Sequence, residues 1–188
     1  MQDYSIYIVL TRSRTIVSKL IHVVSQEEYT HAAISFDRSL QEMYSFGRKY
    51  KHVPFIGRFR RESFNEGVFR AHNNIPGIVI EVKVTEEKYL KAKSLLNNFI
   101  ENSSVYKYHY LGLLYNYLQK EANIENRFIC SEFVYHILKE SDIIDIDMSS
   151  NLVRPETLRT NLRKNIVFEG DLKSPNRRLS YRYLTRAN

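Results

Sequence analysis

The order of strand-like and helix-like segments constrains the fold of this chain more than any other feature of its sequence. Alternating or β-branched apolar runs indicate strands, and apolar residues spaced three and four positions apart indicate helices. The strand-like segments are Tyr4–Leu10, Thr30–Phe36, Leu40–Phe46, Ile78–Val84 and 165–172. The helix-like segments are Thr11–Val24, 85–102 capped by Thr85, a short tyrosine-rich stretch at 106–118, Cys130–Glu140, and the stretch starting at Pro155. This order predicts an α+β fold, with an antiparallel sheet packed against helices.

The chain of 188 residues is long enough for one domain with a substantial core. We expect a single domain over 1–172 and a basic C-terminal tail over 173–188. The three residues Asp37–Ser39 are a credible hairpin turn between two of the strands. The stretch Gly47–Asn74 is basic and rich in Gly, Phe and Arg, and we expect it to be mostly loop.

The composition excludes several classes of protein. Hydrophobic residues make up 43% and charged residues 26%, as in ordinary globular proteins. No run of 18 apolar residues is present, so no membrane span is expected. The N-terminal apolar run has an acid before it and basic residues after it, the reverse of a secretory signal, and we expect a cytoplasmic protein. A single cysteine rules out an internal disulfide and a thiolate-rich zinc site, and the six histidines lack ligand-like spacing, so neither a metal nor a cofactor is expected.

The net charge of +7 is concentrated in two places. Residues 48–61 contain six Lys/Arg and no acid, and residues 172–188 contain five and no acid. Such clusters can bind phosphates or an anionic surface. The simpler explanation, which we prefer for each cluster, is a solvated loop and a loose tail.

The only cysteine, Cys130, stands at the front of an amphipathic helix in "RFICSEFVYHIL". It shares one helical face with Phe133, Val134, Ile137 and Leu138, and a cysteine on such a face is usually a small buried hydrophobe. The alternative interpretation is that Cys130 is a nucleophile, because unpaired amides and the helix dipole at an N-terminus stabilise a thiolate. That interpretation requires a histidine base and a polar group to orient it.

Among the histidines, His31 is the best candidate base, because it stands near the start of a strand in "YTHAAIS". His136 lies six positions after Cys130 and points away from it on the same helix. If Asp37–Ser39 is a three-residue loop, Phe36 pairs with Leu40, and His31 then lies opposite Ser45. Ser45 is therefore the first candidate for the orienting residue. The alternatives are Tyr44, which a two-residue loop would place there, and Glu42.

The segments "YTHAAIS", "MYSFGRK", "FICSEFVYHIL" and "VRPETL" together resemble the permuted papain-fold cysteine hydrolases. These are circularly permuted relatives of NlpC-type peptidases, a group that includes YiiX-like proteins and, more distantly, lecithin:retinol acyltransferase-like enzymes. The histidine comes early and the cysteine late, as in the permuted branch. "CSEFV" on a helix is the most specific element of the resemblance, which spans most of the chain.

The resemblance implies a role for each matching residue. Cys130 matches the nucleophile and His31 the general base. Ser45 falls where the family has its third polar residue, commonly His, Gln, Asn or Glu, so the serine is a departure. The tyrosine-rich segment resembles the wall of the family's cleft, which gives Tyr106, Tyr108 and His109 as wall residues. Tyr44 and Arg48, on either side of Ser45, complete the expected substrate-contacting set with Tyr108 and His109.

The first hypothesis is therefore a cysteine hydrolase of the peptidase or amidase kind, acting on a peptide-like or acyl-containing substrate. Hydrolysis and acyl transfer both fit, and the basic stretch 48–61 favours an anionic substrate. The second hypothesis is a non-enzymatic binding module that uses this basic, aromatic stretch for single-stranded nucleic acid or another phosphate-bearing partner, although no nucleic-acid-binding motif is present. The third is a degenerate papain fold that binds a peptide or protein. The sequence does not indicate an oligomeric state.

Overall fold

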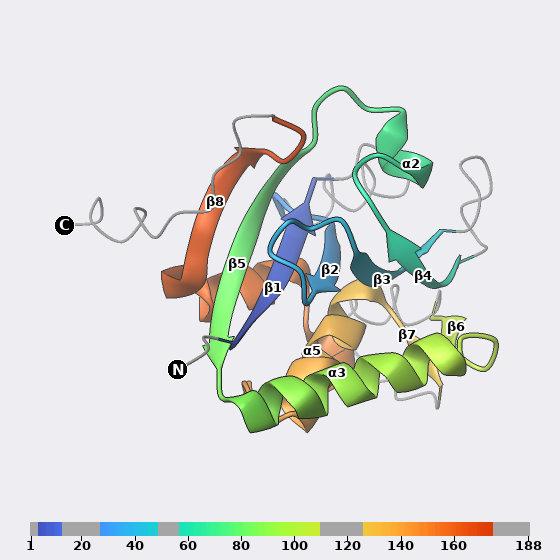
Figure 1. Cartoon of the computed structure of the whole chain (residues 1–188), viewed down its shortest axis with the longest axis vertical. Coiled ribbons are helices and arrows are strands. Elements are labelled where there is room, and N and C mark those ends of the chain that lie inside the picture. Colours follow the sequence, from blue (N-terminus) through green and yellow to red (C-terminus); the bar gives the residue numbers. More distant parts are fainter. Residues whose placement is uncertain (1–3, 13–26, 49–56, 110–125, 175–188) are drawn as a thin grey trace.

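The computed structural model describes residues 4–12, 27–48, 57–109 and 126–174, and places eight strands of this part in one sheet (Figure 1). The order across the sheet is β7-β6-β4-β3-β2-β1-β5-β8. The strands are β1 (Tyr4–Thr11), β2 (His31–Ser35), β3 (Met43–Arg48), β4 (Gly57–Glu62), β5 (Pro76–Val84), β6 (Lys107–Tyr108), β7 (Arg127–Phe128) and β8 (Ile166–Asp171). The helices are α2 (Gly67–Arg70), α3 (Glu86–Glu101), α5 (Cys130–Glu140) and α6 (Pro155–Asn161), with short 3-10 turns at Ser150–Leu152 and Arg163–Asn165.

The predicted α+β class is confirmed, but the sheet is mixed rather than antiparallel. β6 and β7 run parallel, with Lys107 beside Arg127 and Tyr108 beside Phe128, while the other paired strands are antiparallel. A parallel pair cannot be joined by a tight hairpin turn, and residues 109–126 separate β6 from β7 in the sequence.

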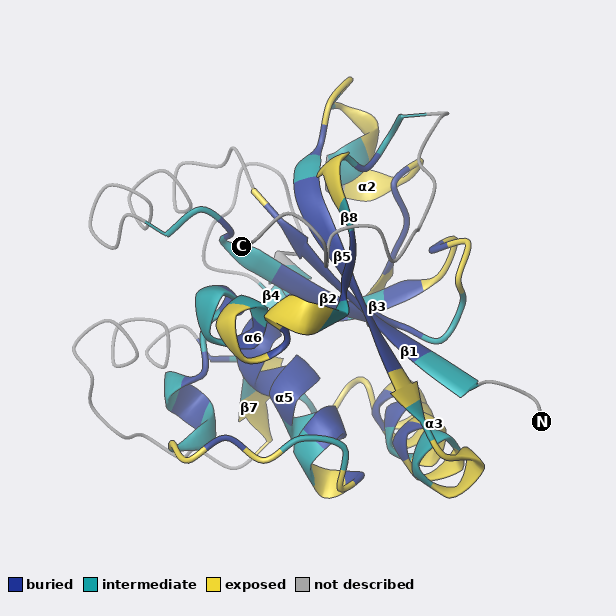
Figure 2. Cartoon of the chain, turned by 90° about the vertical axis from the view of Figure 1, so that its left-hand side faces the viewer, coloured by how far each residue is buried: buried dark blue, intermediate teal, exposed yellow. Residues whose placement is uncertain are grey.

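The sheet has an apolar layer on each face, because alternate residues of its central strands point to opposite sides. One layer contains Ile6, Ile8 and Leu10 of β1 and includes buried side chains of α3 and α5. The other contains Tyr7 and Val9 and packs against residues around α2 and β8. In Figure 2, α5 is largely buried whereas α3 turns an exposed side outward.

The two long helices form where the amphipathic patterns predict them. The Thr85 side chain accepts a hydrogen bond from the backbone N–H of Lys88 and so caps α3. In α5 the apolar face that includes Phe133, Val134, Ile137 and Leu138 is completely buried. Since α5 packs mainly on β2 and β3, the first residue of this helix is held near those strands.

Some sequence expectations are wrong in detail. Thr11 ends β1 rather than starting a helix, and the remainder of the expected first helix lies mostly outside the described residues. The expected loop at 47–74 contains β4 and α2. Lys107–Tyr108 is a short strand where a helix was expected. Residues 110–118 of that expected helix, and 175–188 of the expected tail, lie outside the described residues.

The hairpin between β2 and β3 has a longer connection than predicted. The side chain of Ser35 donates a hydrogen bond to the carbonyl oxygen of Glu42, and the Asp37 carboxylate accepts from the backbone N–H groups of Ser39 and Gln41. These bonds hold a connection that runs from Phe36 to Glu42. The register is consequently shifted: Ile34 pairs with Tyr44, and the same register continued places His31 opposite Gly47.

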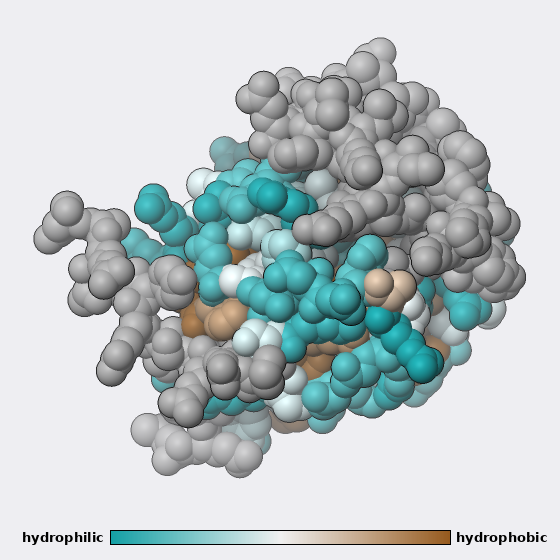
Figure 3. All heavy atoms as spheres, turned by 90° about the horizontal axis from the view of Figure 1, so that it is seen from above, coloured by the Kyte–Doolittle hydropathy of each residue, from teal (hydrophilic) through white to brown (hydrophobic). Residues whose placement is uncertain are grey.

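The side of the molecule seen in Figure 3 is mainly hydrophilic over its described part, with small apolar areas between polar side chains. Among the described residues, no helix has the length and apolar character needed to cross a membrane.

Candidate functional site

Cys130 is the first residue of α5, as expected. Ile129 before it is extended, with φ −92° and ψ 168°, and the helix then continues for 11 residues. The first backbone N–H groups of a helix have no partner within it, so the sulfur lies beside unpaired donors at the positive end of the helix dipole. The thiol is free and 8% exposed.

The start of α5 is held by two neighbouring side chains. The Glu132 carboxylate accepts a hydrogen bond from the Ile129 N–H at 3.2 Å. Burial raises the pKa of Glu132 to about 7, although the Ile129 N–H acts in the opposite direction. The buried Ser131 hydroxyl donates to the carbonyl oxygen of Val153 at 2.7 Å, which ties the first turn to the segment before α6.

His31 is the first residue of β2, and its side chain interacts with Cys130 and Glu62. The Nε2 atom of His31 lies 2.8 Å from Oε2 of Glu62, and the two side chains are only 16% and 8% exposed. Burial opposes protonation of the imidazole, but the Glu62 charge, together with hydrogen bonding and charge interactions with Cys130, raises the pKa of His31 to about 10. Burial acts to raise the pKa of Glu62, but the charge and hydrogen bond of His31 and the charge of Arg60 lower it overall. The pair is therefore an imidazolium and a carboxylate near neutral pH.

Gly47 makes room for this pair on the intervening strand β3. A Cβ atom at this position would lie 3.0 Å from Oε1 of Glu62, 3.6 Å from Cδ of Arg60 and 3.9 Å from Cε1 of His31. Three side chains thus converge over a residue that has none. The close approach explains why glycine stands between the histidine strand and the glutamate strand.

Ser45 is not the partner of His31, and the prediction of this contact is wrong. Its buried hydroxyl donates to the carbonyl oxygen of Ala32 at 2.6 Å. The physical reason is the longer hairpin connection, which moves the partner of His31 from Ser45 to Gly47. A shift by two residues leaves Ser45 on the same face of the sheet but takes it away from the imidazole.

Two of the predicted substrate-contacting residues point into the core layer of α3 and α5. Tyr44 stacks on Phe59 with ring centroids 6.0 Å apart and packs against that layer. Tyr108 packs against the same layer and lies close above Gly57. The alternation of strand residues puts His31 and Glu62 on the other face, so the predicted role of Tyr44 beside His31 is wrong. Tyr106 also turns inward, with its ring centroid 4.2 Å from that of Phe99.

His109 lies beside the strand that leads into Cys130. Its backbone N–H donates to the carbonyl oxygen of Phe128 at 3.0 Å. The side chain is buried, and neither ring nitrogen has a hydrogen-bond partner among the described residues. Burial, and then the charge of Arg127, lower the pKa of His109, so its ring is neutral at pH 7. Arg48 ends β3 opposite Gly57, and its side chain lies outside the described part of the structure.

Glu62 is the residue of this site that sequence reasoning missed. It lies in the stretch expected to be loop, and it faces His31 only because β4 pairs with β3 and β3 with β2. One local signal was available: Glu62 is the first acid after the basic stretch 48–61. A buried cationic imidazole needs a carboxylate, and this was the nearest one following the hairpin.

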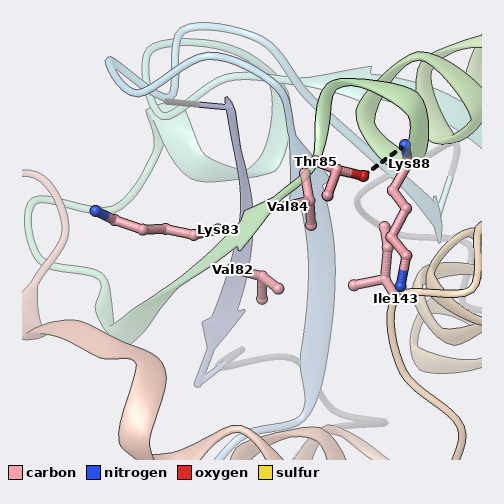
Figure 4. A pocket seen from close by; sticks show the side chains of 6 residues that line it. All are labelled: Val82, Lys83, Val84, Thr85, Lys88 and Ile143. Atoms are coloured by element: carbon pink, nitrogen blue, oxygen red, sulfur yellow. Dashed lines mark hydrogen bonds between the residues drawn. The ribbon is translucent and has the colours of Figure 1, made fainter. Parts of the chain in front are cut away.

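A separate pocket lies at the far end of the sheet. Its lining is Val82, Lys83, Val84, Thr85, Lys88 and Ile143 (Figure 4). Val82–Val84 pair with the beginning of β1, whereas His31 pairs with Thr11 at its end. None of Cys130, His31 and Glu62 lines this pocket, so it is separate from the site at Cys130.

Comparison of the chain with protein-family models, curated proteins and solved structures gave no match.

Proposed function

We propose that this protein is a cysteine hydrolase that attacks an amide or ester carbonyl with the thiolate of Cys130. The observation that carries the proposal is the line of interactions from Glu62 through His31 to Cys130 at the start of α5. A nucleophile, a base and a group that orients the base are the three parts such catalysis needs.

Each nitrogen of His31 has a distinct role in this proposal. Nε2 donates to Glu62, which leaves Nδ1 for the thiol. The carboxylate fixes the ring and favours the imidazolium, and the imidazolium in turn favours the thiolate. Glu62 thus takes the place for which Ser45 was a weak candidate, and a carboxylate orients imidazolium more firmly than a hydroxyl does.

The reaction proceeds in two stages. The Cys130 sulfur forms a bond to the substrate carbonyl carbon, and His31 gives its proton to the departing amine or alcohol as the old bond breaks. Water then attacks the thioester while His31 takes one of its protons, and the carbon–sulfur bond breaks to release the acid and restore the thiolate–imidazolium pair. A second acceptor in place of water would give acyl transfer. The unpaired backbone N–H of Cys130 is the natural donor to the developing oxyanion.

The proposed fold is the permuted papain-like one. Two observations support it. The strand that carries His31 comes earlier in the chain than the helix that carries Cys130, and that helix, α5, packs on the sheet at β2 and β3. The resemblance of "YTHAAIS" and "FICSEFVYHIL" to that family points the same way, and both cysteine and histidine segments coincide with the elements that the family uses.

The test is the alkylation of Cys130 by iodoacetamide. Because the chain has one cysteine, the mass of the intact protein reports this reaction alone. We expect Cys130 to react faster at pH 7 than the thiol of a short cysteine peptide under the same conditions, and His31→Ala to slow the reaction. A wild-type rate like that of the peptide thiol, or an unchanged rate in the variant, would contradict the proposal.

A further inference from the structure

Three basic side chains lie in one row across the edge of the sheet that neighbours the proposed active site. Arg58 of β4 is paired with Lys107 of β6, and Lys107 is paired with Arg127 of β7. Directly paired residues on neighbouring strands point to the same face. We call Arg58, Lys107 and Arg127 the basic row.

The basic row faces the same side of the sheet as His31. Arg58 lies two and four positions before Arg60 and Glu62, so all three share one face of β4. Arg60 and Glu62 converge with His31 over Gly47, which is paired with Arg58. The intervening residues confirm this assignment, since Phe59, Tyr108 and Phe128 turn to the opposite face and pack against the core layer of α3 and α5.

Nothing in the described part of the structure neutralises the row. Arg58, Lys107 and Arg127 are exposed, and none of them forms an ion pair with a carboxylate among the described residues. Like charges directly opposite each other across strands are destabilising. Three of them side by side therefore cost stability, a cost that a bound anion would offset.

The spacing of strands sets the distance from the row to the reaction centre. Neighbouring strands are about 4.8 Å apart, so Arg58, two strands from His31, starts about 10 Å away. At the other end of the row, Arg127 stands three residues before Cys130, so its backbone starts at most about 10 Å from the nucleophile. An anion held by the row would belong to a part of the substrate remote from the carbonyl under attack.

We propose that the basic row binds an anionic oxygen group, a carboxylate or a phosphate, at the end of the substrate remote from the scissile bond. This inference rests on the proposed function and names the substrate class. Arginine suits the role because its guanidinium binds either group through two parallel hydrogen bonds.

The test compares alkylating probes that differ only in their terminal group. N-iodoacetylglycylglycine places a carboxylate about 9 Å beyond the reactive carbon, and its carboxamide is the neutral match. A third probe of similar length ends in a phosphate monoester, so that the two anionic sources are compared. The quantity measured is the ratio of the charged to the neutral labelling rate at Cys130.

For the wild type we expect a ratio on the order of ten at low ionic strength, falling as salt is added. The variant Arg58→Gln/Lys107→Gln/Arg127→Gln should bring the ratio close to one while the carboxamide probe reacts at the wild-type rate, which also shows that the site is folded. The control Lys93→Gln/Arg163→Gln/Lys164→Gln removes the same charge elsewhere and should keep the wild-type ratio.

Three results would overturn the inference. If the row variant keeps the wild-type ratio of charged to neutral labelling rates, the basic row has no specific role. The same conclusion follows if the control variant loses this ratio as fully as the row variant does. If the row variant loses salt-sensitive binding to a single-stranded oligonucleotide but keeps the wild-type ratio of labelling rates, the basic row is a nucleic-acid surface. Slow labelling by every probe in the wild type would instead refute the proposed function, and the inference with it.

Discussion

Glu62 determines the charge on His31. The His31 side chain is only 16% exposed, and this burial alone would keep its ring neutral. The adjacent carboxylate reverses this preference, with the two side chains 2.8 Å apart. In the proposed mechanism this imidazolium assists Cys130, so the proposed nucleophile depends on a residue that lies 68 positions before it in the chain.

We therefore expect Glu62→Gln to slow alkylation of Cys130 at pH 7. The amide retains a hydrogen-bonding oxygen but removes the charge, so the pKa of His31 falls. A fall of one unit corresponds to about 1.4 kcal/mol, or about tenfold in the balance between the charged and neutral pair. The measurement is the pH profile of iodoacetamide labelling.

Ser45→Ala is the matched control for this experiment, because Ser45 lies on the same face of the neighbouring strand but bonds to Ala32. Loss of that bond should reduce stability by about 1 kcal/mol and leave the labelling profile in place. A profile that responds to Ser45→Ala and not to Glu62→Gln would restore the assignment based on the sequence alone.

At the scale of elements, the helices that could be predicted from the sequence are those whose signals lie within a short stretch of the chain. The apolar face of α5 and the cap of α3 are encoded within one or two turns, and both helices lie where the sequence indicates. Cys130 and His31 were identified because each stands at the start of an element with a clear pattern. β4 was missed because Phe59 is its one large apolar residue, and its strand structure comes from pairing with β3 and β6. Glu62 could not be assigned without that pairing.

The N-terminus of α5 has a titrating carboxylate of its own. We expect Glu132→Gln to stabilise the protein at pH 8, because the buried side chain is ionised there at a cost. A raised pKa means that the folded state keeps its proton while the unfolded state has lost it, so stability falls as pH rises from about 4.5 through about 7. The difference in unfolding free energy should reach at most about 3 kcal/mol above pH 7 and vanish near pH 4.5.

Urea unfolding at the two pH values measures this effect. Glu140→Gln, on the exposed end of the same helix, serves as the control and should leave the stability nearly unchanged at both. A Glu132→Gln variant that is less stable than the wild type at pH 8 would mean that the charged carboxylate strengthens the helix start by more than its burial costs.

At the scale of the whole molecule, the sheet brings together segments that are far apart in sequence. His31, Gly47 and Glu62 come from three consecutive strands, and α5 adds Cys130 from the second half of the chain (Figure 1). The site therefore exists only in the folded protein, and the charge on its histidine must be reflected in the stability of the fold as a whole.

The last prediction is a loss of stability on the alkaline side. The unfolded chain releases the His31 proton near pH 6.5, whereas the folded protein holds it to about pH 10. The contribution of this group is therefore fully present below pH 6.5 and is lost as pH rises to 10, with a slope of at most about 1.4 kcal/mol per pH unit.

Urea unfolding between pH 7 and 9.5 should show this decline in the wild type and a shallower one in Glu62→Gln. The pKa of His31 in the folded variant is lower, so His31 contributes less stability that a rise in pH can remove. Glu132→Gln should raise the curve without changing its slope between pH 8 and 9.5, since Glu132 is already ionised in both states above pH 8. A Glu62→Gln curve parallel to that of the wild type would show that the carboxylate does not hold the proton on His31, and the proposed reaction at Cys130 would then lose the support of the His31–Glu62 pair.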